Sequence, residues 1–249
     1  MNIFVINLDK SVERLDEMTE RLNHLGLPYT RISAVYGASL SETELNRHYN
    51  NSLNKRIYRR PLSVGEIGCY LSHRKIWQIM ADEGLEMALV LEDDAELAPE
   101  LPAALETVKK LSRPWDLIKL YEPQDKKPVA RSISLDAQHS LCQYKKIPSR
   151  TTGYLVSLSG ATKLLKARKH FGRPVDDDMQ FYWEYSGVVY GIRPHPIFCA
   201  ESGEQSTIGT AGQTRSRKTI GGILRGPLLR LGYEILRRYH NARSQKLSR

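Results

Sequence analysis

The sequence of 249 residues lacks the signatures of several large enzyme classes. No GxGxxG, Walker A, HExxH or GxSxG pattern occurs, which argues against dehydrogenases, P-loop kinases, zinc proteases and α/β-hydrolases. The three cysteines, Cys69, Cys142 and Cys199, show no CxxC or Cys/His metal spacing, so we expect buried, reduced thiols. No apolar run approaches the roughly 20 residues that a membrane-spanning helix needs.

We expect no signal peptide, because Met1 to Asn7 forms an apolar, strand-like segment that leads directly into charged residues. We therefore expect a cytoplasmic protein. Apolar residues make up 41% of the chain and charged residues 26%, a balance typical of a folded globular protein rather than a disordered or fibrous one.

The body of the chain lacks net charge. The formal net charge is +9, and residues 215–249 account for all of it, with ten Lys and Arg side chains against the single acid Glu234. A neutral body argues against a nucleic-acid-binding surface on the fold itself.

Apolar periodicity predicts alternating strands and helices, the pattern of an α/β fold. We expect strands at residues 3–7, 29–33, 88–91, 116–121, 153–157 and 188–192, and helices at residues 12–25, 64–81, 101–111 and 161–167. Ser63 and Glu66 predict a capping box at the start of the second helix. Residues 38–61 read as a loop or irregular helical insertion, and residues 122–146 as a polar excursion.

Three carboxylates, Glu92, Asp93 and Asp94, follow the apolar segment ALVL. Ligand sites of open α/β sheets lie beyond the carboxyl ends of strands. A divalent cation such as Mg²⁺ or Mn²⁺, shared with substrate phosphates, would relieve the repulsion between three adjacent charges. A solvated acidic turn is equally compatible with the pattern.

A second acidic run, Asp176, Asp177 and Asp178, follows Pro174 and Val175. Carboxylates here could cap a helix that begins near residue 179, although three are more than a cap needs. One of them could instead accept a proton from an attacking hydroxyl if a cation and a sugar donor bind close by.

Asn7, Asp9 and Arg14 lie at the end of the first expected strand and in the turn and helix start that follow it. Backbone amides and a cation there could face a nucleotide, and ordinary surface charge is the alternative. His73, within SHRKIW, is expected to bridge buried polar groups rather than to act as a base.

Several segments together resemble glycosyltransferase family 25, the lipooligosaccharide and lipopolysaccharide galactosyltransferase-type enzymes, whose relatives include the collagen galactosyltransferases. The matching segments follow the family's order: VINLDKSVERL at 5–15, AVYG at 34–37, GEIGCYLSHRKIW at 65–77, ALVLEDDA at 88–95, GYLVSLSGATKLL at 153–165 and PVDDD at 174–178.

The resemblance implies a GT-A-type fold, in which a mainly parallel central sheet flanked by helices binds a nucleotide sugar over the ends of its strands. It implies Asp94 as the direct ligand of Mn²⁺ or Mg²⁺, with Glu92 or Asp93 assisting at the metal or the ribose. Residues Asn7, Asp9 and Arg14 match the donor-side wall of the family.

The family acts with inversion and commonly uses UDP-galactose, so the resemblance implies transfer of galactose to a lipooligosaccharide, lipopolysaccharide or other surface-glycan acceptor. Asp176 or Asp177 is then the expected base, with Asp176 favoured because it stands at the Asp of the family's PVD segment. The alternatives are a metal-dependent phosphoryl or nucleotidyl transferase, or a non-catalytic sugar-nucleotide or lipid-binding protein. Release of free UDP with sugar transfer would support the glycosyltransferase interpretation, whereas release of pyrophosphate or simple binding would support the alternatives.

The basic tail, residues 215–249, is expected to follow a transferase domain at residues 1–214. A helix from Pro227 would place Leu228, Leu231, Ile235 and Tyr239 on one stripe. Such a helix could lie on the anionic inner face of a membrane, bind nucleic acid, or pack on the body. Since acceptor glycans of this class are built on lipid at that face, we expect peripheral membrane association and no nucleic-acid partner.

Overall fold

The computed structural model describes residues 1–123, 128–199 and 220–243, with the side chains of the last segment described from residue 225. The proposed boundary between residues 214 and 215 lies outside these ranges. The helices are α1 (Val12–His24), α2 (Glu42–His48), α3 (Asn51–Ile57), α4 (Val64–Glu83), α5 (Leu101–Lys109), α6 (Leu158–Ala167), α7 (Val175–Met179) and α8 (Ile220–Arg243), with 3₁₀ turns η1 (Gly37–Ser39) and η2 (Tyr182–Glu184).

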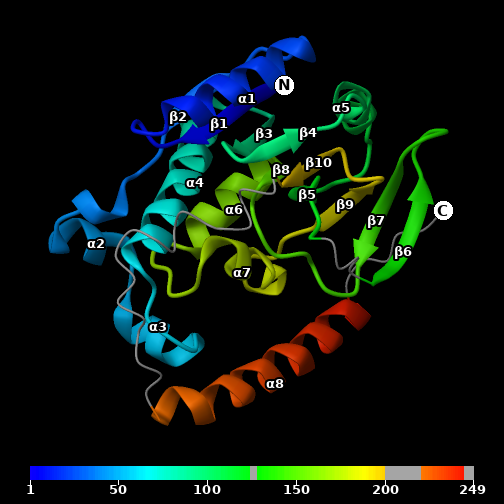
Figure 1. The fold of residues 1–249 in the computed structure, drawn as a ribbon. Helices are drawn as coiled ribbons and strands as arrows, with labels where there is room; N and C mark the ends of the chain where they lie inside the picture. Colours follow the sequence, from blue (N-terminus) through cyan, green and yellow to red (C-terminus); the bar gives the residue numbers. More distant parts are fainter. Residues whose placement is uncertain (124–127, 200–219, 244–249) are drawn as a thin grey trace.

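A mixed sheet of eight strands forms the centre of the molecule (Figure 1). In chain order its strands are β1 (Asn2–Asn7), β2 (Thr30–Ser33), β3 (Met87–Glu92), β5 (Leu117–Lys119), β6 (Val129–Ser134), β7 (Ser140–Tyr144), β8 (Gly153–Ser157) and β9 (Val189–Arg193). Their spatial order is β2-β1-β3-β8-β5-β9-β7-β6. A second, two-stranded sheet pairs β4 (Ala95–Leu97) with β10 (Ile197–Cys199).

The expected α/β architecture, with a central sheet flanked by helices, is confirmed. Six of the eight strands run in one direction, because β7 and β8 alone are antiparallel to their neighbours on both sides. Parallel pairing between neighbours is nevertheless limited to β1 with β2, β1 with β3, and β5 with β9. The sheet is therefore mainly parallel in strand direction but mixed in its pairing.

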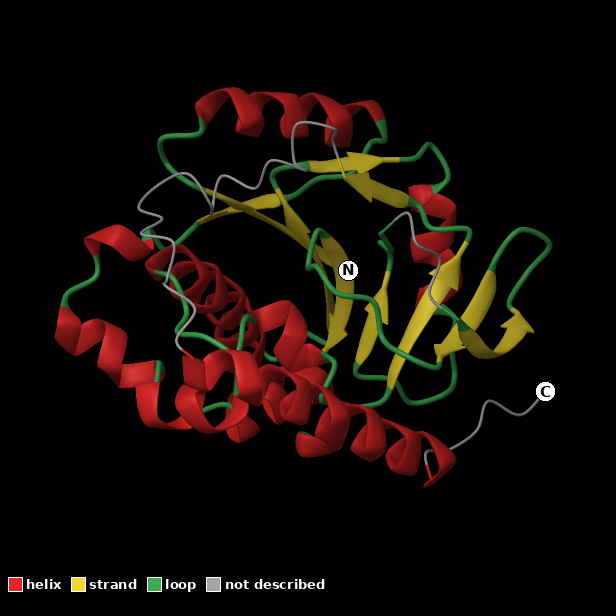
Figure 2. Cartoon of the chain, turned by 60° about the horizontal axis from the view of Figure 1, so that its bottom comes forward, coloured by secondary structure: helices red, strands yellow, loops and turns green. Residues whose placement is uncertain are grey.

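Helices cover both faces of the sheet (Figure 2). Leu89 and Leu91 of β3 point to the face covered by α1 and α5, whereas Ala88 and Val90 point to the face covered by α4, α6 and α7. Alternate side chains of a strand point to opposite faces, so a strand buried on both sides reads as a continuous apolar run. This explains why the ALVL segment is apolar throughout.

Two glycines of the matching motifs permit a close approach between α4 and the preceding loop. A Cβ on Gly37 would lie 1.8 Å from the carbonyl oxygen of Val64, and one on Gly68 would lie 2.4 Å from that of Val35. Ser63 and Glu66 form the expected capping box at the start of α4, which fixes its first turn beside this loop. The loop and α4 therefore pack as one unit.

The two segments without clean periodicity contain regular structure, and residues 38–61 form the helical insertion that was one of the two expectations for them. Residues 38–61 include α2 and α3, each of seven residues, and α2 has its own capping box at Ser41 and Glu44. Residues 122–146 include the hairpin of β6 and β7. Because β6 is an exposed edge strand, its side chains follow no apolar alternation.

The C-terminal helix α8 begins at Ile220, seven residues before the expected start, and continues across Pro227. Its contacts to the body come from polar and aromatic side chains. Tyr233 donates a hydrogen bond to Gln180 (3.2 Å), Asn241 donates to the carbonyl of Lys145 (2.7 Å), and the His240 ring stacks on Trp183 (5.1 Å between centroids). The helix therefore packs on the body, one of the expected alternatives, and lies beside α7 (Figure 1).

The leucine stripe of α8 faces away from the body. Leu228, Leu231, Ile235 and Tyr239 are exposed over 68%, 58%, 58% and 49% of their surface. These side chains are therefore not core residues. Among the described helices, none combines the length with the hydropathy that a membrane-spanning segment requires.

Candidate active site

The first acidic cluster lies at the edge of the sheet where β1, β3 and β5 end. Glu92 is the last residue of β3, Asn7 of β1 and Lys119 of β5. Strand β8 runs in the opposite direction, so the residues that precede it, Thr151 and Thr152, arrive at the same edge. The Glu92 amide donates to the carbonyl of Thr152 (3.0 Å), which continues the ladder to this edge. The topology thus brings side chains from four strands together.

Asp93 is held by two of the expected donor-side residues. Asn7 Nδ2 donates to Asp93 Oδ2 (2.9 Å), and Arg14 NH1 donates to Asp93 Oδ1 (3.1 Å). Burial raises the pKa of Asp93, and these two donors oppose that rise. Asn7 and Arg14 therefore fix the Asp93 carboxylate at the edge of the sheet.

Asp9, the third expected donor-side residue, does not contact the acidic cluster. Its carboxylate accepts from Arg31 (2.5 Å) and Ser33 (2.9 Å), and these hydrogen bonds lower its pKa. Arg31 also donates to Asn7 Oδ1 (3.1 Å), so Arg31 links Asp9 to a residue that holds Asp93.

Asp94 is the least satisfied carboxylate of the cluster. Burial and the charges of Glu92 and Asp93 raise its pKa to about 7. Its Oδ1 is buried, and no hydrogen-bond donor contacts it within the described residues. Buried polar atoms nearly always have a partner, so an unpartnered carboxylate oxygen beside two further carboxylates fits a cation site.

Glu92 is held from the side of α4. His73 Nε2 lies 3.2 Å from Glu92 Oε1, and Thr151 Oγ1 donates a short hydrogen bond to the same oxygen. Burial opposes ionisation of Glu92, but the bonds from His73 and Thr151 and the charge of Lys119 lower its pKa below the ordinary value. Glu92 is therefore an anion beside Asp94.

The second acidic run lies inside α7 rather than before a helix, which corrects the expected cap. The helix spans Val175–Met179 with Pro174 as its N-cap residue, and none of the three aspartates makes a capping hydrogen bond. They occupy its first turn, where carboxylates interact favourably with the helix dipole.

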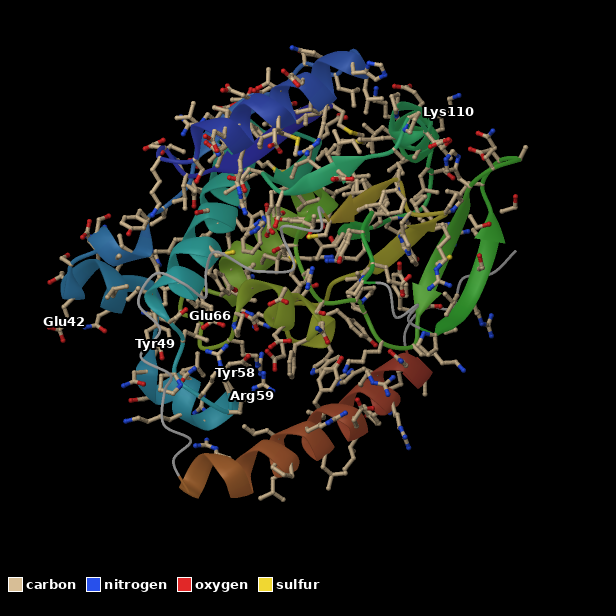
Figure 3. All side chains as sticks on the ribbon, in the orientation of Figure 1. Glu42, Tyr49, Tyr58, Arg59, Glu66 and Lys110 are labelled. Carbon is tan, nitrogen blue, oxygen red and sulfur yellow. The ribbon has the colours of Figure 1, made fainter. Side chains whose placement is uncertain are left out.

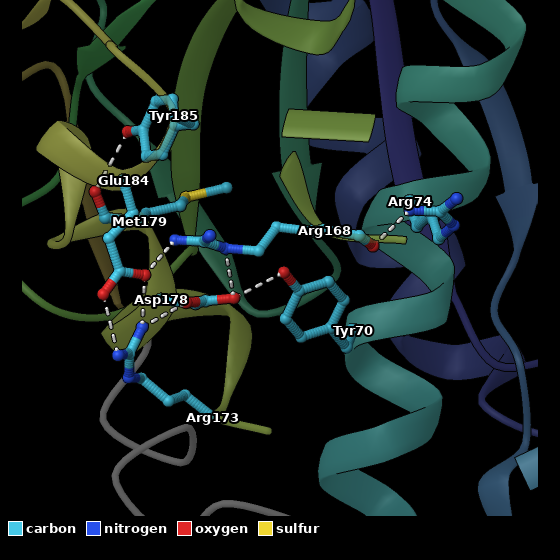
Figure 4. A network of polar contacts seen from close by, with 8 residues as sticks. All are labelled: Tyr70, Arg74, Arg168, Arg173, Asp178, Met179, Glu184 and Tyr185. Carbon is cyan, nitrogen blue, oxygen red and sulfur yellow. Dashed lines mark hydrogen bonds and ion pairs between the residues drawn. The ribbon is translucent and has the colours of Figure 1, made fainter. Parts of the chain in front are cut away.

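Asp178 belongs to a buried network of ion pairs (Figure 4). Arg173 donates to its Oδ1 (2.9 Å), while Tyr70 (2.8 Å) and Arg168 Nε (2.9 Å) contact its Oδ2. Both arginines also pair with Glu184. A cavity of about 290 Å³ lies beside this network, and these paired charges line it. Asp178 is a structural residue.

Asp176 and Asp177 have fewer partners than Asp178. Asp176 Oδ2 accepts from the backbone amide of Arg150 (3.0 Å), and Asp177 Oδ2 accepts from the Tyr58 hydroxyl (3.0 Å). Burial and the charge of Asp176 raise the pKa of Asp177. Tyr58 and Arg59 directly follow α3, and Figure 3 shows both labelled between α3 and α7.

Lys119 connects the two acidic clusters. Its side chain is buried, and its ammonium donates a short hydrogen bond to the carbonyl of Arg150, whose amide in turn donates to Asp176. Burial lowers the pKa of Lys119 to about 8, against the opposing charges of Asp176 and Glu92. The structure therefore brings Asp176 into the same electrostatic environment as Glu92.

Sequence reasoning missed Lys119, Arg150 and Thr151. A lysine within the apolar strand segment DLIKLY is the one available signal, because a lysine is almost never fully buried unless it is paired. Arg150 adopts a positive φ of 64°, which no sequence motif predicted. The expected structural role of His73 is confirmed, since it bridges Tyr154 and Glu92.

Comparison with known proteins gives a consistent result. The chain matches the family described as Glycosyltransferase family 25 (LPS biosynthesis protein) over residues 1–179, which include both acidic clusters. It is similar to Procollagen galactosyltransferase 1-B of Xenopus laevis, with 33% identity over 213 residues that cover 78% of this chain and 31% of that protein. Procollagen galactosyltransferase 2 of Homo sapiens is 32% identical over 213 residues, or 77% of this chain and 30% of that protein.

A Glycosyltransferase 25 family member of Aedes aegypti is 33% identical over 179 residues, which cover 67% of this chain and 28% of that protein. The chain thus spans about a third of the length of the curated relatives that it matches. The family match covers well over half of the chain and includes the sheet edge with its carboxylates. This protein belongs to glycosyltransferase family 25.

Proposed function

We propose that the chain transfers galactose from UDP-galactose to a hydroxyl of a lipooligosaccharide, lipopolysaccharide or other surface-glycan acceptor, with inversion and with the help of a divalent cation. The single observation that carries the proposal is the buried, unpartnered Asp94 Oδ1 beside Glu92 and Asp93 at the strand ends. Family membership and the galactosyltransferase names of the relatives support the sugar.

Asp94 and Glu92 are the residues that would hold Mn²⁺ or Mg²⁺. Hard cations of this kind are bound by one or two carboxylates together with substrate phosphates. The cation would neutralise the charge that develops on the diphosphate leaving group. Asp93, which accepts hydrogen bonds from Asn7 and Arg14, would orient the ribose of the donor.

Asp176 or Asp177 would accept the proton of the attacking hydroxyl. In a single displacement the acceptor oxygen forms a bond to the anomeric carbon, the bond from that carbon to the UDP oxygen breaks, and the hydroxyl proton passes to a carboxylate. A raised pKa, as burial produces at Asp177, makes a carboxylate a stronger base. Asp176 shares its surroundings with Glu92 through Lys119.

We also infer that α8 attaches the protein to the cytoplasmic, anionic face of a membrane. The stripe of Leu228, Leu231 and Ile235 is exposed, and Arg238 and Arg243 are exposed on the same helix. Each Lys or Arg near an anionic surface adds roughly 1 kcal/mol of attraction. Since α8 contacts Gln180 and Trp183, just after α7, it would present a lipid-linked acceptor beside Asp176 and Asp177.

The direct test incubates the full chain with UDP-galactose and a lipooligosaccharide acceptor, once with Mn²⁺ and once with EDTA. The proposal predicts free UDP and a galactosylated acceptor of inverted anomeric configuration in the first reaction only. Release of galactose 1-phosphate in place of UDP, or transfer that is unchanged by EDTA, would contradict it. Replacing UDP-galactose with UDP-glucose in a parallel reaction tests the assignment of the sugar.

A further inference from the structure

A buried chain of hydrogen bonds runs from α4 to Glu92. His73 and Trp77 lie one turn apart on α4, and the hydroxyl of Tyr154 on β8 sits between them. Trp77 Nε1 is 3.1 Å from this hydroxyl, His73 Nδ1 is 3.0 Å from it, and His73 Nε2 is 3.2 Å from Glu92 Oε1. Trp77, His73 and Tyr154 each have 0% of their surface exposed, so solvent does not complete these bonds.

The chemistry of the groups fixes the position of every hydrogen in the chain. An indole N–H only donates, so the Tyr154 oxygen accepts from Trp77. The Tyr154 hydrogen then needs an acceptor, and His73 Nδ1 is the one that the described residues supply. His73 Nδ1 is therefore without a hydrogen, and the ring carries its hydrogen on Nε2, which donates to Glu92.

The bonds at Glu92 all fall on one oxygen. His73 and Thr151 both contact Oε1, and no described residue donates to Oε2. The carboxylate is thereby held by one oxygen, and the other has no donor among the described residues. In the other neutral tautomer of His73, Nε2 would carry a lone pair and could not donate a hydrogen bond to the Glu92 carboxylate.

We propose that Trp77 and Tyr154 fix His73 in the Nε2–H tautomer, and that His73 is thereby a positioning residue that holds Glu92 Oε1 and leaves Oε2 to the cation and the sugar donor. The tautomer follows from the hydrogen-bond chain alone. Only the last step, the benefit to cation and donor, rests on the proposed function.

The same chain of bonds argues against a competing assignment. Ligand atoms of Cys69, His73 and Glu92 all lie within 4.8 Å of one another, as in a metal site. A metal on His73 Nε2 would move the ring hydrogen to Nδ1, where it would oppose the Tyr154 hydroxyl hydrogen. The Tyr154 hydrogen would then be buried without an acceptor, which is unfavourable. Cys69 should therefore make no contribution to cation binding.

The tautomer can be measured directly in the full wild-type chain labelled with ¹⁵N-histidine. The nitrogen shifts and couplings of a histidine distinguish a protonated ring nitrogen from a bare one, and the spectrum of His73→Gln identifies the signal of His73 among the seven histidines. We expect a protonated Nε2 and a bare Nδ1 at neutral pH. A hydrogen on Nδ1, in a neutral or a charged ring, would overturn the proposal.

The positioning role is tested by calorimetric titration of UDP with and without Mn²⁺ for three variants. His73→Gln keeps an N–H donor and an acceptor, whereas His73→Met fills similar space without a donor. We expect His73→Met to weaken the Mn²⁺-dependent affinity by roughly 10- to 100-fold, His73→Gln to restore most of it, and the control Cys69→Ser to change nothing.

Two results would overturn the positioning role. One is His73→Met that binds UDP with Mn²⁺ as tightly as the wild type does. The other is Cys69→Ser that loses as much affinity as His73→Met, which would favour the cysteine-containing metal site. If the wild-type chain itself binds no UDP, the proposed function fails, while the tautomer assignment stands or falls with the nitrogen spectrum.

Discussion

Two acidic runs of three residues look alike in the sequence, yet the structure treats them differently. Within the second run, Asp178 is enclosed by Arg168, Arg173 and Tyr70. Within the first, Asp94 is only partly buried as a residue, but its Oδ1 is buried and has no hydrogen-bond donor among the described residues. The difference shows that a structural carboxylate is distinguished from a candidate ligand-binding one by its hydrogen-bond and ion-pair partners, and not by the number of adjacent charges.

The largest expected effect concerns Asp176 and Asp177, which accept no hydrogen bond from an arginine side chain among the described residues. Asp176→Asn or Asp177→Asn, whichever removes the base, should lower turnover by roughly 10² to 10⁴ while UDP affinity survives. Initial rates of galactose transfer and calorimetric UDP titrations check the two parts. If both variants transfer sugar at the wild-type rate, the whole second run is structural.

The next effect concerns stability. Asp178→Ala removes the shared partner of two buried arginines, so it should lower the free energy of unfolding by about 3 to 5 kcal/mol. Urea denaturation followed by circular dichroism measures this change. Glu44→Ala, at an exposed carboxylate of α2, serves as a control expected to cost only about 1 kcal/mol through its capping box. Equal losses in the two variants would mean that Asp178 is no more structural than a surface acid.

A smaller effect is expected next to the second run, on α8. The double variant Leu231→Gln, Ile235→Gln should reduce binding to anionic vesicles by roughly tenfold and leave both acidic clusters and the stability of the fold unchanged. Sedimentation with anionic and with zwitterionic vesicles measures binding. The control Val12→Gln alters an equally exposed apolar residue on α1, at 58% exposure.

Two outcomes of that experiment would contradict membrane attachment through α8. One is wild-type protein that stays in the supernatant with anionic vesicles. The other is a wild-type dimer in size-exclusion chromatography that the double variant converts to a monomer, because the stripe would then bind a second copy of the chain.

The smallest effect is confined to alkaline pH and concerns Lys119, which lies between the two clusters. Its folded pKa of about 8 is below its ordinary value of 10.5, so the unfolded chain binds more protons between these values. The stability of the wild type relative to Lys119→Met should therefore rise with pH from about 8 to 10.5. A stability difference that stays constant over this window would contradict the depressed pKa.

Much of the fold was readable from the sequence because its central strands are buried on both faces. The apolar segment ALVL lies inside β3, which extends one residue beyond it at each end, and the expected strand GYLVS coincides with β8. The edge hairpin of β6 and β7 was missed, since an exposed edge has no apolar period. The short helices α2 and α3 confirm the helical alternative for residues 38–61, but their bounds could not be predicted because seven residues give too few turns for a period to show.

The first acidic cluster was also predictable, since carboxylates directly after a buried strand must emerge at the edge of the sheet. The roles within the second run were not. Asp178 is bound by Tyr70, Arg168 and Arg173, and the two arginines also pair with Glu184. These partners lie outside α7, so the acidic run itself does not reveal them. The role of Lys119 could not be predicted either, because its contact with Arg150 depends on the pairing of β5 with β8.

The central claim is that the first cluster binds a cation and, through it, the diphosphate of a sugar donor. Calorimetric titration of UDP into the wild-type chain and into Asp94→Asn, each with Mn²⁺ and with EDTA, tests it most directly. The account predicts tight binding only for the wild type with Mn²⁺, and an intact fold in the variant, because the change is local to a strand end. Unchanged Mn²⁺-dependent affinity in Asp94→Asn, or wild-type affinity that EDTA does not alter, would contradict it.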